Sequence, residues 1–134
     1  MKLAIRTLII AIVAVAVNTT AFAARNVDKT VQEARAAVES ASPDDWHTYA
    51  KAAEKCIDKG VNMKEAAKWI KRSVEIRETA YNMQVLGDYY VANRLPEQAL
   101  EAYSKSIRIG KLADNDYRDK ATQDKIVSLV KQIG

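Results

Sequence analysis

Apolar and polar residues follow the period of an α-helix from about residue 27 onward. Strand signals, which are alternating β-branched runs bounded by turns, are absent after residue 23. The first helical pattern covers roughly 27–40, and Asn26 is positioned to cap it. Its apolar residues recur at spacings of three and four: Val27, Val31, Ala34 and Val38. The pattern predicts an all-α fold.

The stretch SPDDW at 42–46 predicts the start of a second helix. Ser42 is placed to cap it, Pro43 suits its first turn, and the two aspartates favour the positive end of the helix dipole. This helix runs to about Asp58 and stops at Gly60, because glycine readily adopts the left-handed conformation that ends many helices.

Capping patterns also divide the middle of the chain. Asn62 is followed by Glu65 three residues later, which is a capping-box arrangement that predicts a third helix over about 63–77. Thr79 is expected to open a fourth helix, which ends near Asn93.

The last two predicted helices follow from a proline and a group of acids. Pro96 opens the fifth helix and Gly110 ends it, while Asp114 or Asn115 starts the sixth. The sixth helix is expected to bury one apolar side: Tyr117, Ala121, Ile126, Leu129, Val130 and Ile133.

Two segments of the chain are similar to each other. KEAAKWIKRSVEI at 64–76 aligns without gaps on EQALEAYSKSIRI at 97–109, at an offset of 33 residues. At the same offset the preceding helices pair Ala53 with Leu86, Ile57 with Tyr90, and Gly60 with Asn93. A period of this length is typical of stacked helix pairs.

The segment YNMQVLGDYYVANRLPEQALEAY at 81–103 resembles a tetratricopeptide repeat. It has small and aromatic residues where that family places its own, although Gly110-Lys111 replaces the family's closing proline. The residues that the resemblance assigns to packing within the units are Ala53, Ile57, Ala66, Ile70, Ser73, Leu86, Gly87, Tyr90, Ala99, Tyr103 and Ser106.

The resemblance implies a right-handed stack of two helical hairpins, at about 45–77 and 79–110. Stacked repeats usually need three or more units to bury a continuous core. We therefore expect the helices at about 27–40 and 115–132 to cap the two open ends.

The first 23 residues have the pattern of a secretory signal. Two basic residues precede an apolar run at 8–17, and AFA at 21–23 offers the small residues that a signal peptidase reads. An uncleaved anchor is the alternative, but a spanning helix needs about 20 apolar residues. We expect a signal peptide at 1–23, a single domain at 24–134, a periplasmic or secreted location, and no membrane insertion after cleavage.

Charge and cysteine content narrow the expected partners. Removal of the signal leaves 19 basic residues against 17 acidic ones, which does not predict a nucleic-acid site, because such sites need clustered lysine and arginine. The single cysteine, Cys56, excludes an internal disulfide. It is either a small buried side chain or a thiol that pairs between chains.

The resemblance also implies a ligand surface on the concave face, made by the first helix of each pair. The matching residues are Thr48, Lys51, Lys55, Asp58, Lys59, Tyr81, Gln84, Asp88 and Val91. Independently of the resemblance, Lys51, Lys55 and Lys59 recur every four residues and form one helix stripe. That stripe is either a solvated helix face or a site for an acidic segment of a protein or peptide.

Nothing in the sequence assembles a catalytic set. His47 is the only histidine and lies beside two aspartates, but one helix turn offers too few ligands for zinc. Trp69 aligns with the small Ala102, so its ring is a candidate for partial exposure on the outer face. We expect a non-enzymatic adaptor or scaffold without cofactor or metal. The alternative is a structural protein that oligomerises through exposed stack ends.

Overall fold

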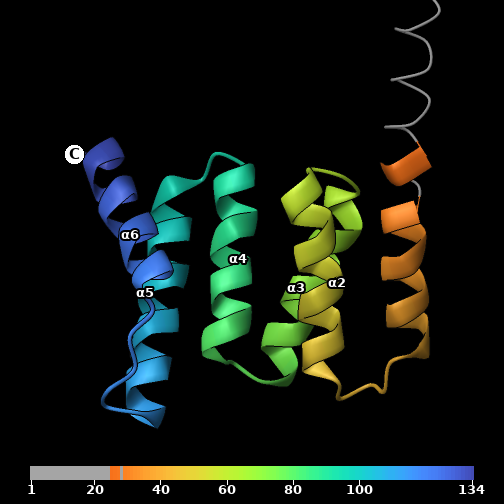
Figure 1. The fold of residues 1–134 in the computed structure, drawn as a ribbon, viewed down its shortest axis with the longest axis horizontal. Coiled ribbons are helices and arrows are strands. Elements are labelled where there is room, and N and C mark those ends of the chain that lie inside the picture. The colour runs from red at the N-terminus through yellow and green to blue at the C-terminus, as the bar shows by residue number, and fades with distance from the viewer. Residues whose placement is uncertain (1–24, 28) are drawn as a thin grey trace, which may run out of the picture.

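The computed structural model describes residues 25–27 and 29–134, and within these residues every regular element is a helix. Figure 1 shows the helices standing side by side in one row, joined by short connections. Residues 29–40 are helical, and the helices that follow are α2 (Trp46–Lys59), α3 (Met63–Ile76), α4 (Ala80–Ala92), α5 (Pro96–Ala113) and α6 (Lys120–Ile133). The predicted all-α helical stack is confirmed, while the expected signal peptide lies outside the described residues.

The stack is built from two helix pairs. α2 packs on α3 and α4 packs on α5, while α4 also contacts both helices of the first pair. The residues at 29–40 flank the first pair, where Ala34 joins its buried cluster, and α6 packs on α5 at the other end. Each helix therefore contacts near neighbours in the chain, as expected of a repeat architecture.

One buried hydrogen bond occurs in both pairs and defines the repeat physically. The hydroxyl of Ser73 donates to the carbonyl of Trp46 at 2.7 Å, and the hydroxyl of Ser106 donates to the carbonyl of Ala80 at 2.6 Å. Both serines are fully buried. Each bond ties the second helix of a pair to the first residue of the first helix, so the two pairs have the same internal geometry.

The turn that ends the first helix of each pair corrects the gap-free alignment. Gly60 (φ 63°) and Arg94 (φ 59°) both adopt the left-handed conformation. In each turn the next residue donates its backbone N–H to the carbonyl five positions earlier, at 2.9 Å. Gly60 therefore corresponds to Arg94, and its predicted alignment with Asn93 is wrong by one residue.

Asn62 is the extra residue that restores the offset of 33 in the second helices. Its backbone is left-handed (φ 51°) and its side chain makes no capping hydrogen bond. The predicted capping box is therefore absent, and the Glu65 carboxylate instead accepts a hydrogen bond from Arg35 at 2.7 Å. With the insertion placed here, Ala53 corresponds to Gly87 rather than to Leu86, and both residues are buried.

Side-chain caps begin three of the helices. Thr79 caps α4 in a capping box with Asn82, as the sequence predicts for its start. α2 begins three residues later than predicted, because Asp45 is its cap and accepts the Thr48 N–H at 3.0 Å. The predicted cap, Ser42, instead lies in the turn before the helix, where its carbonyl accepts the N–H of Asp45. The predicted cap of the first helix is also wrong, because Asn26 is itself helical.

Gly110 does not end α5, contrary to the prediction. The helix continues to Ala113, and a Cβ at Gly110 would lie 2.3 Å from the ring of Tyr117. The missing side chain thus allows the connection at 114–119 to pack its ring against α5. Consequently α6 begins only at Lys120, with Asp119 as its cap, and not at 114 or 115.

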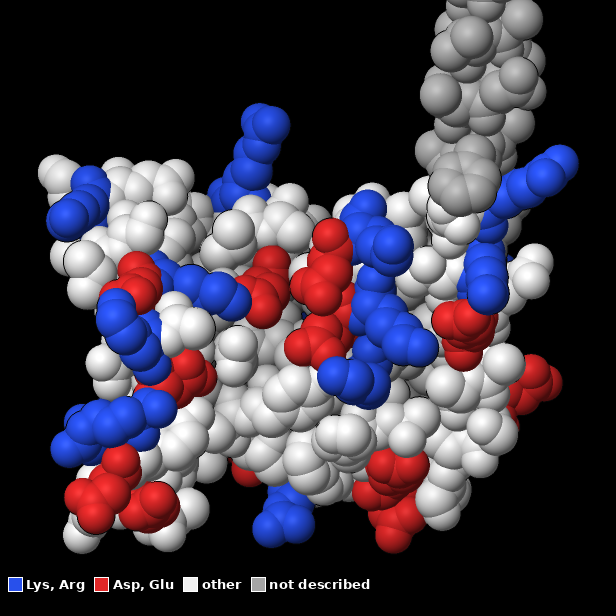
Figure 2. Space-filling model, in the orientation of Figure 1, with Lys and Arg blue, Asp and Glu red and all other residues white. Residues whose placement is uncertain are grey.

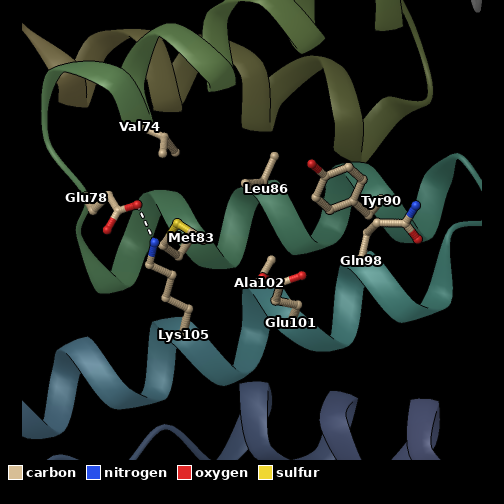
Figure 3. A pocket seen from close by; sticks show the side chains of 9 residues that line it. All are labelled: Val74, Glu78, Met83, Leu86, Tyr90, Gln98, Glu101, Ala102 and Lys105. Atoms are coloured by element: carbon tan, nitrogen blue, oxygen red, sulfur yellow. Dashed lines mark hydrogen bonds and ion pairs between the residues drawn. The ribbon is translucent and has the colours of Figure 1, made fainter.

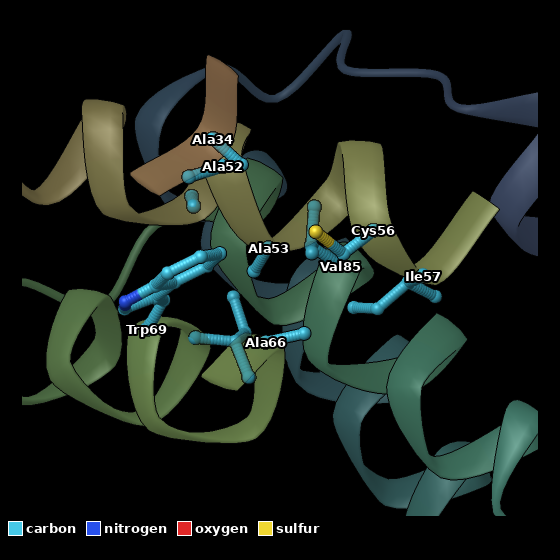
Figure 4. Close-up of a cluster of buried hydrophobic side chains, with 10 residues drawn as sticks. Ala34, Ala52, Ala53, Cys56, Ile57, Ala66, Trp69 and Val85 are labelled. Atoms are coloured by element: carbon cyan, nitrogen blue, oxygen red, sulfur yellow. The ribbon is translucent and has the colours of Figure 1, made fainter. Parts of the chain in front are cut away.

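The buried side chains form two clusters, of which Figure 4 shows the larger, between residue 34 and α4. Cys56 is fully buried there, as one of its two interpretations predicts. Trp69 is only 8% exposed, so the expectation of an exposed ring is wrong. In α6, Leu129 is buried, but Val130 is 53% exposed because α6 meets only one neighbouring pair. The other residues predicted inward that are exposed are Ala121 and Ile133.

We predict that Gly87→Ala destabilises the protein. The added Cβ would lie 2.3 Å from Cε1 of Tyr103, whose ring is 1% exposed and whose hydroxyl donates to Asp88 at 2.5 Å. The ring has no free space to move into, so overpacking should cost about 1–3 kcal/mol. Urea unfolding followed by circular dichroism measures this cost. Adding Tyr103→Leu should recover part of it, and a loss below about 0.5 kcal/mol would contradict the close approach.

The two left-handed turns give a reciprocal prediction. Arg94→Gly should stabilise the protein by about 0.5–1 kcal/mol, because the left-handed conformation costs an ordinary residue more than the extra chain entropy of glycine. Gly60→Ala should destabilise by about 1 kcal/mol for the same reason, although nothing lies within 4 Å of the new methyl group. Two changes of the same sign in urea unfolding would show that Gly60 and Arg94 are not equivalent.

Candidate partner-binding site

The candidate site lies on the first helices of the two pairs, α2 and α4, which contact each other, and it continues onto α6. Figure 2 shows lysine, arginine and acidic side chains mingled on this side of the molecule, over α2 and toward α4. The nine predicted site residues are all carried by α2 and α4, and the structure divides them between two charged clusters and two grooves.

The lysine stripe of α2 is partly paired with carboxylates. Lys51 Nζ lies 2.9 Å from Glu54, and Lys55 Nζ lies 3.8 Å from Glu33 on the preceding helix. Lys59, at the end of α2, is exposed. The three lysines therefore share a helix side as predicted, but neighbouring carboxylates reduce the net positive charge that they present.

Tyr81 joins the α2 lysines to α4. Its hydroxyl donates to Glu54 at 2.8 Å, and Lys51 Nζ lies 5.7 Å from its ring centroid. Burial, together with the bond to Glu54, raises the pKa of Tyr81, so the phenol stays protonated as the donor. The sequence prediction omitted Glu54, although its spacing of three from Lys51 is a signal for such a pair.

A second charged cluster links α4, α5 and α6 through Asp88. This carboxylate accepts hydrogen bonds from Tyr103 at 2.5 Å and from Lys125 at 2.6 Å. Burial and the bond to Asp88 raise the pKa of Tyr103. Lys125 was not predicted, because it lies 37 residues from Asp88 and belongs to a different helix.

Asp58 lies between the two clusters and is exposed. Partial burial of its carboxyl, with the negative charges of Glu54 and Asp88, raises the pKa of Asp58. Lys125 and Lys51 act in the opposite direction but do not cancel this effect. The middle of the site is therefore acidic, whereas Lys55 and Lys59 make one border basic.

Two shallow grooves receive the remaining residues. Thr48, Lys51 and Lys55 line a groove of about 150 Å³ against residues 34–37. Asp88 and Val91 line another of about 250 Å³ against α6. The remaining residue, Gln84, is half-buried on α4 between these grooves. The predicted residues thus share one side of the molecule without forming a single pocket.

The described residues offer little for other kinds of chemistry. His47 is exposed and packs between the rings of Trp46 and Tyr81, with centroids 5.5 Å away in each case. No group of three or more His, Cys, Asp or Glu side chains in residues 25–27 and 29–134 is arranged to hold a metal ion. Within the same ranges, no helix is long and apolar enough to cross a bilayer.

A scan against protein-family models found no match for this chain, and searches of curated proteins and of solved structures found none either.

The raised pKa of Asp58 leads to a pH-dependent prediction. Because the folded protein binds this proton more tightly than the unfolded chain does, the stability that Asp58 contributes is present below its unfolded pKa of about 3.9 and is lost as the pH rises through the folded pKa. Asp58→Asn removes that loss. We expect a higher urea midpoint than in the original protein at pH 7 and nearly equal midpoints at pH 3.

Asp116→Asn, in the exposed connection before α6, is the matched control and should leave the midpoint unchanged at both values of pH. If Asp58→Asn lowered the midpoint at pH 7, Asp58 would be held by an attractive contact, and the acidic centre described above would be refuted.

Proposed function

We propose that this chain is a non-enzymatic protein-interaction module of the tetratricopeptide-repeat kind, which acts outside the cytoplasm as an adaptor or scaffold. The single observation that carries the proposal is the repeated serine-to-carbonyl bond, which ties two helix pairs into one row. Such a row holds the side chains of its first helices in place before a partner arrives. A preformed surface lowers the ordering cost of binding.

The partner proposed for this site is a protein or peptide segment that lies across α2 and α4. Lys55 and Lys59 would receive acidic groups at one border, while Glu54, Asp58 and Asp88 would disfavour acids at the centre. A segment with acidic residues at one end fits this arrangement better than a uniformly acidic one. Opposed charges of this kind select among partners more than they add to affinity.

A second candidate function is self-association through the end of the stack. Val127 and Val130 are each 53% exposed on α6, which is the last helix of the row. Exposed apolar side chains at an open repeat end favour contact with another copy. Cys56 is buried, so the support for this candidate is packing and not a disulfide between chains.

We predict that exchanging Lys51, Lys55 and Lys59 for glutamate abolishes capture of a native partner. The protein obtained from the full chain and this triple variant would each be immobilised and exposed to an extracytoplasmic extract of the source cells. The charge reversal should weaken capture at least tenfold, and added salt should weaken capture by the unchanged protein, because these charges are exposed.

Exchanging Lys64, Lys68 and Lys71 for glutamate makes the same charge change on exposed positions of α3 and should leave capture intact. Circular dichroism of each variant establishes that it is folded. Equal capture by both variants would move the binding site away from α2. Capture of nothing but further copies of the chain would favour self-association through α6.

A further inference from the structure

A pocket of about 220 Å³ opens where α3, α4 and α5 meet, away from the candidate partner-binding site. None of the nine predicted site residues lines it. Figure 3 shows that its apolar wall combines side chains from all three helices, among them Val74, Met83, Leu86 and Ala102. The ion pair between Glu78 and Lys105 closes one end of this wall.

The first helix pair shows what fills the corresponding place. Ala102 corresponds to Trp69, because the second helices are 33 residues apart, and Leu86 corresponds to Ala52, because the first helices are 34 apart. Trp69 is only 8% exposed and belongs to one buried cluster with Ala34 and Ala52 (Figure 4). The chain therefore covers the seam before its first pair with its own indole.

The seam between the two pairs is packed differently. Its larger side chains, Leu86 and Tyr90, come from α4, while α5 contributes the small Ala102. The methyl group of Ala102 does not reach across the seam as an indole does, so an open pocket remains over Leu86 and Met83. The difference between two otherwise equivalent seams is one missing ring on the second helix.

The size and polarity of the pocket select its occupant. An apolar cavity of about 150 Å³ accepts benzene, so about 220 Å³ with one open side has room for an indole. The polar side chains of Gln98 and Glu101, which offer oxygen acceptors, stand at the edge beside Tyr90 and Ala102 (Figure 3). A buried indole N–H needs such an acceptor, whereas an aliphatic side chain would leave these groups without a donor.

We propose that this pocket binds a tryptophan side chain presented by a partner protein. The indole lies against Met83 and Leu86, and its N–H donates to Glu101 or Gln98. The partner's ring would then occupy the place that Trp69 occupies in the first pair. This contact is separate from the lysine border of α2, so one partner can engage both surfaces or two partners can engage one each.

The test is a titration of the protein made from the full chain with N-acetyl-tryptophanamide, observed through ¹³C-labelled methionine methyl groups. The Met83 methyl group lines the pocket and should shift in a saturable way, while the Met63 methyl group in α3 should not. N-acetyl-leucinamide should bind at least fivefold more weakly. No saturable Met83 shift, or equal binding of the leucine probe, would overturn the proposal.

Ala102→Trp places the ring of the first seam into the second and should reduce probe affinity at least tenfold. If that variant fails to fold, Gln98→Leu combined with Glu101→Leu removes the acceptors from exposed positions and should abolish the preference for the tryptophan probe. Unchanged affinity and preference in the folded variants would overturn the proposal. The triple lysine variant should bind the probe normally, so failure of the proposed function leaves this result interpretable.

Discussion

The close approach of the two helices within a pair is the constraint on which the rest of the structure depends. In the second pair, Gly87 provides the space that the Tyr103 ring fills, and Ala53 is the small buried residue at the equivalent position of the first. That ring carries its hydroxyl to Asp88, which in turn accepts a hydrogen bond from Lys125. A packing requirement inside one pair thus positions a charged cluster on the surface and attaches α6 to it.

The charges of the candidate face act mainly on one another. Lys51, Lys55 and Lys125 each lie near a carboxylate of the same chain, and most of these groups are at least partly exposed. Exposed ion pairs contribute little to stability, so their chief effect is to decide which partner charges are tolerated at each place. The surface combines an acidic centre with a basic border, and a partner has to match both.

The two seams of the stack show how a repeat diverges without losing its geometry. The serine hydroxyls hold both pairs in the same arrangement, so large and small residues can be exchanged between the helices that meet at each seam. The first seam receives its bulk from Trp69 and the second from Leu86 and Tyr90. That exchange conserves the stack but leaves one seam open to an outside side chain.

The sequence by itself determined the helical class, the order of the helices, the period near 33 residues and the starts at Thr79 and Pro96, because each depends on contacts within about one helix turn. It also placed the lysines of α2 on one stripe. Tertiary structure decided the insertion at Asn62, the late start of α6 and the contact of Lys125 with Asp88. These features depend on groups that lie far apart in the chain or on the ring of Tyr117 packing against Gly110, and local periodicity carries no information about either.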